Sequence, residues 1–80
     1  MASYWYFLEQ EDDPLEPRRY SKINGTPNCT GDEVICAIHA REQFINKISC
    51  PLIDQPLLNE MAEAINMATN TKNVKLRDLD

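Results

Sequence analysis

Hydrophobic and polar side chains alternate in several short stretches of the chain, with the period of two residues that is typical of β-strands. Residues 3–9 carry large side chains on both faces, and residues 34–40 are nearly apolar on both, as in a central strand. Residues 73–77 alternate apolar and basic side chains, which predicts a terminal strand with one face in water. Residues 18–23 are expected to form another strand, because Asn24-Gly25 favours a tight turn. For residues 34–40, a short helix remains the competing interpretation.

Helical spacing is clearest between residues 55 and 69. Asp54 is placed to act as the N-cap, and Pro56 falls in the first turn, where its missing N–H costs nothing. Asn70 is the expected left-handed C-cap. The face expected to pack on the core comprises Leu58, Met61, Ile65 and Ala68, and it is widened by Leu57, Ala62 and Ala64.

The remaining segments are expected to be loops. Residues 10–17 are acidic and contain two prolines. Residues 41–53 show neither the strand period nor the helix period. A chain of 80 residues makes one domain, 1–80. The predicted fold is therefore α+β, with a three- or four-stranded, mostly antiparallel sheet and one amphipathic helix packed on one face.

The net negative charge of the chain disfavours some classes of binding partner. The formal net charge is −5, from 13 acidic and 8 basic side chains. An acidic surface disfavours phosphate backbones and anionic lipid, so we expect no nucleic-acid binding and no direct membrane insertion. The start of the chain lacks the pattern of a secretory signal, so a cytoplasmic location is the default expectation and the final compartment is unknown.

Three cysteines leave at least one thiol unpaired. Cys29 and Cys36 are the better pair, because the short segment between them can fold back on itself. The alternative is that Cys36 is a buried thiol within an apolar strand, as expected in a reducing compartment. Cys50 is the third cysteine. With one histidine and no Cys-x-x-Cys, the sequence indicates no zinc site and no cofactor.

Several spaced residues suggest relatives for this chain. They are Pro27-x-Cys29, Cys36-Ala37-Ile38-x-Ala40 and Thr71-x-Asn73-Val74-x-Leu76, in addition to the aromatic start. Together they resemble a group of short, uncharacterised bacterial proteins of the Bacteroidota type. The resemblance implies a whole one-domain protein and carries over no catalytic residue.

Candidate catalytic chemistry is sparse. His39 has acidic residues nearby in sequence, but no nucleophile is placed beside it on the same strand face. The acidic segment from Glu9 to Glu16 offers oxygen ligands for calcium, yet its spacing matches no calcium loop. We therefore expect no catalytic residue, no metal site and no enzyme; a small hydrolase centred on His39 is the weakest alternative.

The unbroken aromatic run is the candidate partner-binding feature, although aromatic residues on a strand usually serve the core and cover the sheet. The run consists of Tyr4, Trp5, Tyr6 and Phe7. If the helix covers the Tyr4 side, then Trp5 and Phe7 stand on the uncovered face with Ile35 and Ala37, and exposed apolar patches mark interfaces. The leading hypothesis is a non-enzymatic interaction protein: a small accessory subunit, or a homo-oligomer, docking through this face or an edge strand. The alternative is an exported structural or surface protein stapled by Cys29 and Cys36.

Overall fold

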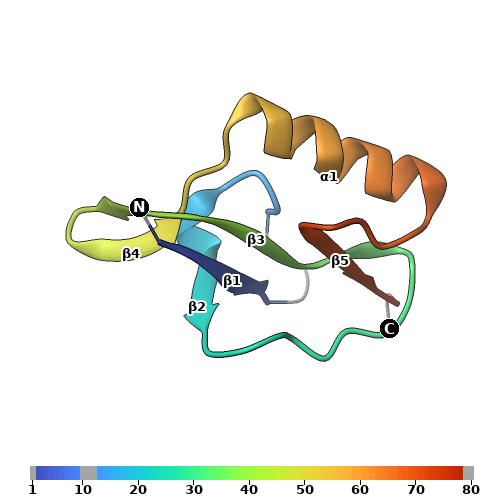
Figure 1. Ribbon diagram of the computed structural model, residues 1–80, viewed down its shortest axis with the longest axis horizontal. Coiled ribbons are helices and arrows are strands. Elements are labelled where there is room, and N and C mark those ends of the chain that lie inside the picture. Colours follow the sequence, from blue (N-terminus) through green and yellow to red (C-terminus); the bar gives the residue numbers. More distant parts are fainter. Residues whose placement is uncertain (1, 10–12, 79–80) are drawn as a thin grey trace.

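One long strand, β3 (Val34–Ile45), organises the sheet (Figure 1). This computed structural model describes residues 2–9 and 13–78. Along one edge β3 pairs antiparallel with β1, and along the other with β5 and then β4. β2 pairs with β1, so the path β2-β1-β3-β4 has β5 as an additional partner of β3. The other elements are β1 (Ser3–Leu8), a 3-10 helix (Pro17–Arg19), β2 (Tyr20–Ile23), β4 (Ile48–Pro51), α1 (Gln55–Met67) and β5 (Val74–Arg77).

The sheet is curled, so that its end strands β4 and β2 approach each other. Side chains from both ends of the sheet meet there. The Glu42 carboxylate accepts a hydrogen bond from the Ser49 hydroxyl at 2.6 Å and forms an ion pair with Lys22 Nζ at 3.1 Å. These two donors hold the pKa of Glu42 below its ordinary value. The contact closes the sheet around the core.

The stretch 41–53, expected to be a loop, instead forms the end of β3 and all of β4. Asn46 and Lys47 make the connecting turn, with φ angles of 52° and 68°. Positive φ angles at both positions suit a two-residue hairpin turn. Because the turn contains no glycine, the sequence does not indicate it. The period is also obscured, because Phe44 and Ile48 are 65% and 58% exposed. The predicted α+β fold is thus confirmed: in the described residues one helix packs on an antiparallel sheet, which has five strands where three or four were expected.

Helix α1 begins as the sequence indicates and ends differently. The Asp54 carboxylate accepts a hydrogen bond from the Leu57 amide at 3.1 Å, and Pro56 lies in the first turn. The left-handed C-cap is Ala68, at φ 51°, and not Asn70. The Asn70 side chain serves β5 instead, because its carbonyl oxygen accepts a hydrogen bond from the Leu76 amide at 2.8 Å.

The face that α1 buries is one part of the widened face expected from the sequence. Leu57, Met61 and Ala64 are buried, whereas Ile65 is 44% exposed. Helical spacing alone does not decide which part of this face is buried, and the small Ala64 lets α1 approach β5 closely. The main core consists of Tyr6, Leu8, Tyr20, Ile35, Ile38, Ala40, Leu57, Met61, Ala64, Val74 and Leu76.

Candidate functional site

The side of the sheet opposite α1 carries a cluster of aromatic and basic residues. Trp5 stands opposite His39, and Ala37 stands between Phe7 on β1 and Lys75 on β5. Because side chains alternate along a strand, these residues share the face that the core residues do not use. We call this surface the aromatic face; it comprises Trp5, Phe7, Ala37, His39, Lys75 and Arg77.

Each of the two large rings on the aromatic face lies beneath a cation. Lys75 Nζ is 5.5 Å from the centre of the Trp5 ring, and Arg77 Cζ is 5.3 Å from that of Phe7. The His39 ring lies 5.2 Å from Trp5 at a tilt of 57°. Cation–π contacts of this kind contribute about 0.5–1 kcal/mol each at exposed positions. Every ionisable group of the aromatic face is thus basic, in a protein whose net charge is −5.

A β-bulge decides which β3 residues reach this face. The expectation placed Ile35 beside Ala37, but Ile35 lies in the core. Ile35 pairs with Leu76 and Ala37 pairs with Lys75, so Cys36 is an extra residue between them. The extra residue shifts the alternation by one position and turns Ile35 toward α1.

Two of the four residues in the predicted binding run face the core. Tyr6 is 0% exposed, and its hydroxyl lies 3.3 Å from Ser49 Oγ. Burial raises the pKa of Tyr6 above its ordinary value. Tyr4 packs half-buried against the core, with Lys22 Nζ 4.2 Å from its ring centre. Of the run, Trp5 and Phe7 are therefore the residues that lie on the aromatic face, and both are half-buried.

Cys29 and Cys36 form a disulfide that ties the segment before β3 to the bulge, with Cα atoms 6.2 Å apart. Residues 24–33 run along the side of the sheet away from α1 (Figure 1). The segment is also held to the end of β5, because the Asp78 amide donates to the Thr30 carbonyl at 3.0 Å. Gly31, at φ 126°, permits this approach: a Cβ there would collide with the Asp78 backbone.

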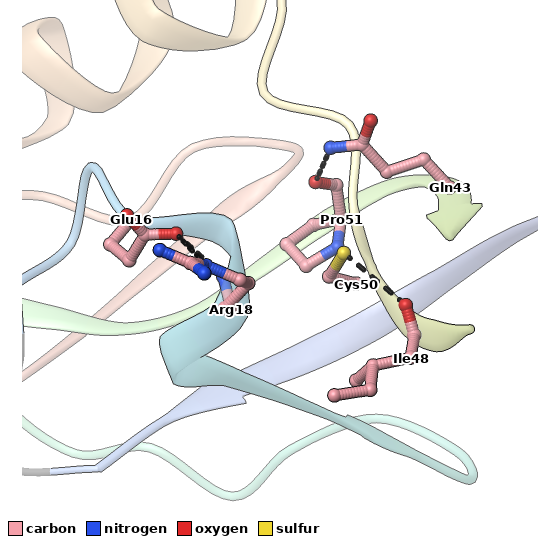
Figure 2. Close-up of polar contacts among 6 residues, drawn as sticks. All are labelled: Glu16, Arg18, Gln43, Ile48, Cys50 and Pro51. Atoms are coloured by element: carbon pink, nitrogen blue, oxygen red, sulfur yellow. Dashed lines mark hydrogen bonds and ion pairs between the residues drawn. The ribbon is translucent and has the colours of Figure 1, made fainter. Parts of the chain in front are cut away.

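Cys50 is a free, buried cysteine inside the β3–β4 hairpin. Figure 2 shows its sulfur directed at the Ile48 carbonyl, 3.5 Å away, while the Gln43 side chain donates to the Pro51 carbonyl at 2.8 Å. The same view shows the ion pair of Arg18 with Glu16 at 3.0 Å. Reactive cysteines are usually partly exposed, so the buried Cys50 is placed as a residue that packs the hairpin.

The weaker candidates for chemistry do not come together. Within residues 2–9 and 13–78, no three His, Cys, Asp or Glu side chains gather as metal ligands would. Residues 10–12 of the acidic segment lie outside the described residues. Asp13 and Glu16 from that segment accept hydrogen bonds from Leu15 and Arg18.

Sequence reasoning missed the two carboxylates with the most hydrogen bonds from distant parts of the chain. Glu42 joins β3 to Ser49 and Lys22, and Glu60 on α1 accepts hydrogen bonds from Thr71 and Asn73. These donors lie between 7 and 20 residues from the carboxylates in the sequence, so no local sequence pattern predicts the contacts. The Thr71-x-Asn73 spacing was noted only as part of a resemblance.

Comparison of the chain with protein families, curated proteins and solved structures found no match. The resemblance to short Bacteroidota proteins therefore stays a prediction. In the described part of the chain, none of the helical structure combines the length and the apolar character needed for a membrane span.

Proposed function

We propose that the protein is a non-enzymatic interaction module that docks an acidic segment of a partner protein on the aromatic face. The observation that carries the proposal is the basic character of this face: Trp5 and Phe7 are accompanied by His39, Lys75 and Arg77. Aromatic residues and arginine are enriched in protein interfaces, and complementary charge guides the encounter of two partners.

The same charges bear on the choice between a foreign partner and a second copy. Two copies that docked through this face about a two-fold axis would oppose Lys75 and Arg77 with the same cations. An acidic partner instead gains charge-assisted hydrogen bonds to these groups while its apolar side chains cover Trp5. The role of accessory subunit is therefore favoured over that of homo-oligomer.

An NMR titration of the ¹⁵N-labelled protein with an acidic peptide of alternating Asp and Leu tests the proposal. We expect chemical-shift changes centred on Trp5, His39 and Lys75 that weaken with added salt. Trp5→Ser and Lys75→Glu should each abolish them. The matched controls are Phe44→Ser, an exposed aromatic on the hairpin, and Arg19→Glu, an exposed cation outside the face; both should bind as the wild type does.

Light scattering of the unreduced protein separates the remaining outcomes. A monomer that binds the peptide supports the accessory role. A dimer that dissociates in the Trp5→Ser variant would contradict the accessory role and indicate self-association through the aromatic face. Binding that survives both Trp5→Ser and Lys75→Glu would overturn the proposed surface.

The disulfide supports a second candidate function, an exported structural or surface protein. Disulfides persist in oxidising compartments, and the Cys29–Cys36 bond staples the longest described segment without helix or strand. Thiol counting on protein taken from its native source, quenched with acid, decides this point: one reactive thiol supports export, and three contradict it.

A further inference from the structure

The Cys29–Cys36 disulfide closes a loop beside the end of β5, and we call residues 29–36 the disulfide loop. Cys36 is the extra residue of the β3 bulge and is only 2% exposed. Ala37, the next residue, belongs to the aromatic face. Cys29, at the other end of the loop, lies half-buried in a segment without helix or strand. The bond thus fastens this segment to the strand that carries the centre of the aromatic face.

The disulfide loop holds the peptide group that follows Arg77. The Glu33 amide of the loop donates to the Arg77 carbonyl at 3.1 Å, and the Asp78 amide donates to the Thr30 carbonyl of the loop at 3.0 Å. This carbonyl and this amide belong to one peptide group, so the loop contacts both of its polar atoms. Gly31 packs so closely here that a Cβ at its position would collide with the Asp78 backbone. The backbone that carries the Arg77 side chain is therefore fixed by the disulfide loop.

The Arg77 side chain occupies a position that costs it a hydrogen bond. Its Cζ lies 5.3 Å from the centre of the Phe7 ring. Its Nε is buried, and within residues 2–9 and 13–78 no acceptor reaches this atom. Buried donors without a partner are rare in proteins, because such a donor has given up its hydrogen bond to water. The guanidinium would regain that bond by moving away from Phe7, and the fixed backbone at Arg77 opposes this movement.

The disulfide can be reduced from one of its two ends. Cys29 keeps part of its surface exposed, whereas Cys36 is buried. A thiolate of a dithiol reductant therefore attacks Sγ of Cys29, and Cys36 leaves as a thiolate that takes up a proton. The second thiol of the reductant then attacks the mixed disulfide and releases Cys29. Two electrons and two protons pass to the protein, and the reductant becomes a cyclic disulfide.

We propose that the Cys29–Cys36 disulfide is a redox switch for the aromatic face. While the bond is formed, the disulfide loop holds Arg77 over Phe7, and the face is arranged to receive an acidic segment. After reduction, the loop and the end of β5 loosen, Arg77 Nε returns to water, and the Phe7 end of the face loses its cation. The effect on binding rests on the function proposed above, whereas the effect on Arg77 does not.

The Nε–H signal of Arg77 in NMR spectra of the ¹⁵N-labelled protein reports the local change. In the oxidised protein the ring current of Phe7 should displace this signal from its value in an unfolded chain, and Phe7→Leu should remove the displacement. Reduction with dithiothreitol should remove at least half of it and leave the Ile38 amide signal in place. An Arg77 signal that does not move on reduction would overturn the proposal. Loss of the folded Ile38 signal would also overturn it, because the whole fold would then depend on the bond.

Titration with the acidic peptide of alternating Asp and Leu separates the switch from the proposed function. The oxidised protein should bind this peptide about three- to tenfold more tightly than the reduced protein, because its Arg77 is already in place. Cys29→Ser should bind as the reduced wild type does, with or without dithiothreitol. If the oxidised protein does not bind the peptide, the proposed function is wrong, and the Arg77 signal alone decides whether the disulfide controls this side chain. Equal or tighter binding by the reduced protein would overturn the switch and leave the proposed function standing.

Two control variants exclude other effects of the reductant. Cys50→Ala removes the free, buried thiol and should respond to dithiothreitol as the wild type does. Glu60→Gln weakens the contact between α1 and the start of β5 on the core side, and should leave both the Arg77 signal and the affinity for the peptide unchanged. If Glu60→Gln weakens peptide binding as much as reduction does, general loss of stability explains the effect and the proposed switch is wrong.

Discussion

The two sides of β1 have different surroundings, although their residues alternate in one short strand. Tyr6 and Leu8 face the core and are buried. Trp5 and Phe7 point to the other side, where they stay half-buried beneath Lys75 and Arg77. On the core side the side chains gain stability by leaving water, whereas on the aromatic side cations cover rings that keep part of their surface exposed. Under the proposed function, stability and recognition are divided between the two sides of the sheet.

The largest expected effect tests this division directly. Tyr6→Ala removes a fully buried ring and should lower the free energy of unfolding by about 3–5 kcal/mol. Trp5→Ala removes a larger but half-buried ring and should cost only about 1–2 kcal/mol. Urea denaturation of both variants measures the difference. Equal costs would mean that the aromatic face is a second core and has no surplus surface for a partner.

The second effect concerns the Cys29–Cys36 disulfide. Cys29→Ser removes the cross-link to Cys36 and should lower the free energy of unfolding by about 2–3 kcal/mol, as expected for a short closed loop. Hydrogen exchange should accelerate at residues 24–33 more than at Ile38 on the core side. Added reductant should destabilise the wild type by the same amount and leave the variant unchanged; a wild type insensitive to reductant would contradict this prediction.

The smallest effect concerns the core side, where Glu60 joins α1 to the start of β5. Glu60→Gln should cost about 1–2 kcal/mol at neutral pH, because Thr71 and Asn73 lose a charged acceptor. The pKa of Glu60 in the folded protein lies below 4.5, so this stabilisation is complete above that pH and disappears as the pH falls through the folded pKa. The measurement is thermal unfolding of both proteins across acidic pH.

A control on the same helix sharpens this last result. Glu63→Gln alters an exposed carboxylate of α1 and should change the stability little at any pH. If Glu63→Gln follows the same pH dependence as Glu60→Gln, the effect would belong to the net charge of the helix and not to the contact with Asn73.

Much of the fold could be predicted because its signals are local. The alternation of residues 3–9 and 73–77 gave β1 and β5, and Asp54 with Pro56 marked the start of α1. The β3–β4 hairpin escaped prediction because Lys47 rarely adopts a positive φ and because its strands expose apolar side chains. Which part of the expected α1 face is buried also depends on packing, which helical spacing alone does not determine.

The candidate site could be predicted only in part. Alternation placed Trp5, Phe7 and Ala37 on one face, and that placement agrees with the structure. The bulge at Cys36, which removes Ile35 from that face, depends on the register between β3 and β5. The same register brings Lys75 and Arg77 over the rings, and pairing between segments so far apart in sequence leaves no local pattern.

The two-residue turn at Asn46 and Lys47 also has a consequence for the order of folding. It connects the one neighbouring pair of strands that closes almost without loop entropy, whereas β1 and β5 must reach β3 from distant parts of the chain. We therefore expect the β3–β4 hairpin to form early and to serve as the nucleus on which the other strands assemble. Substitutions in this turn should change the folding rate more than the unfolding rate, and substitutions in β5 should do the reverse.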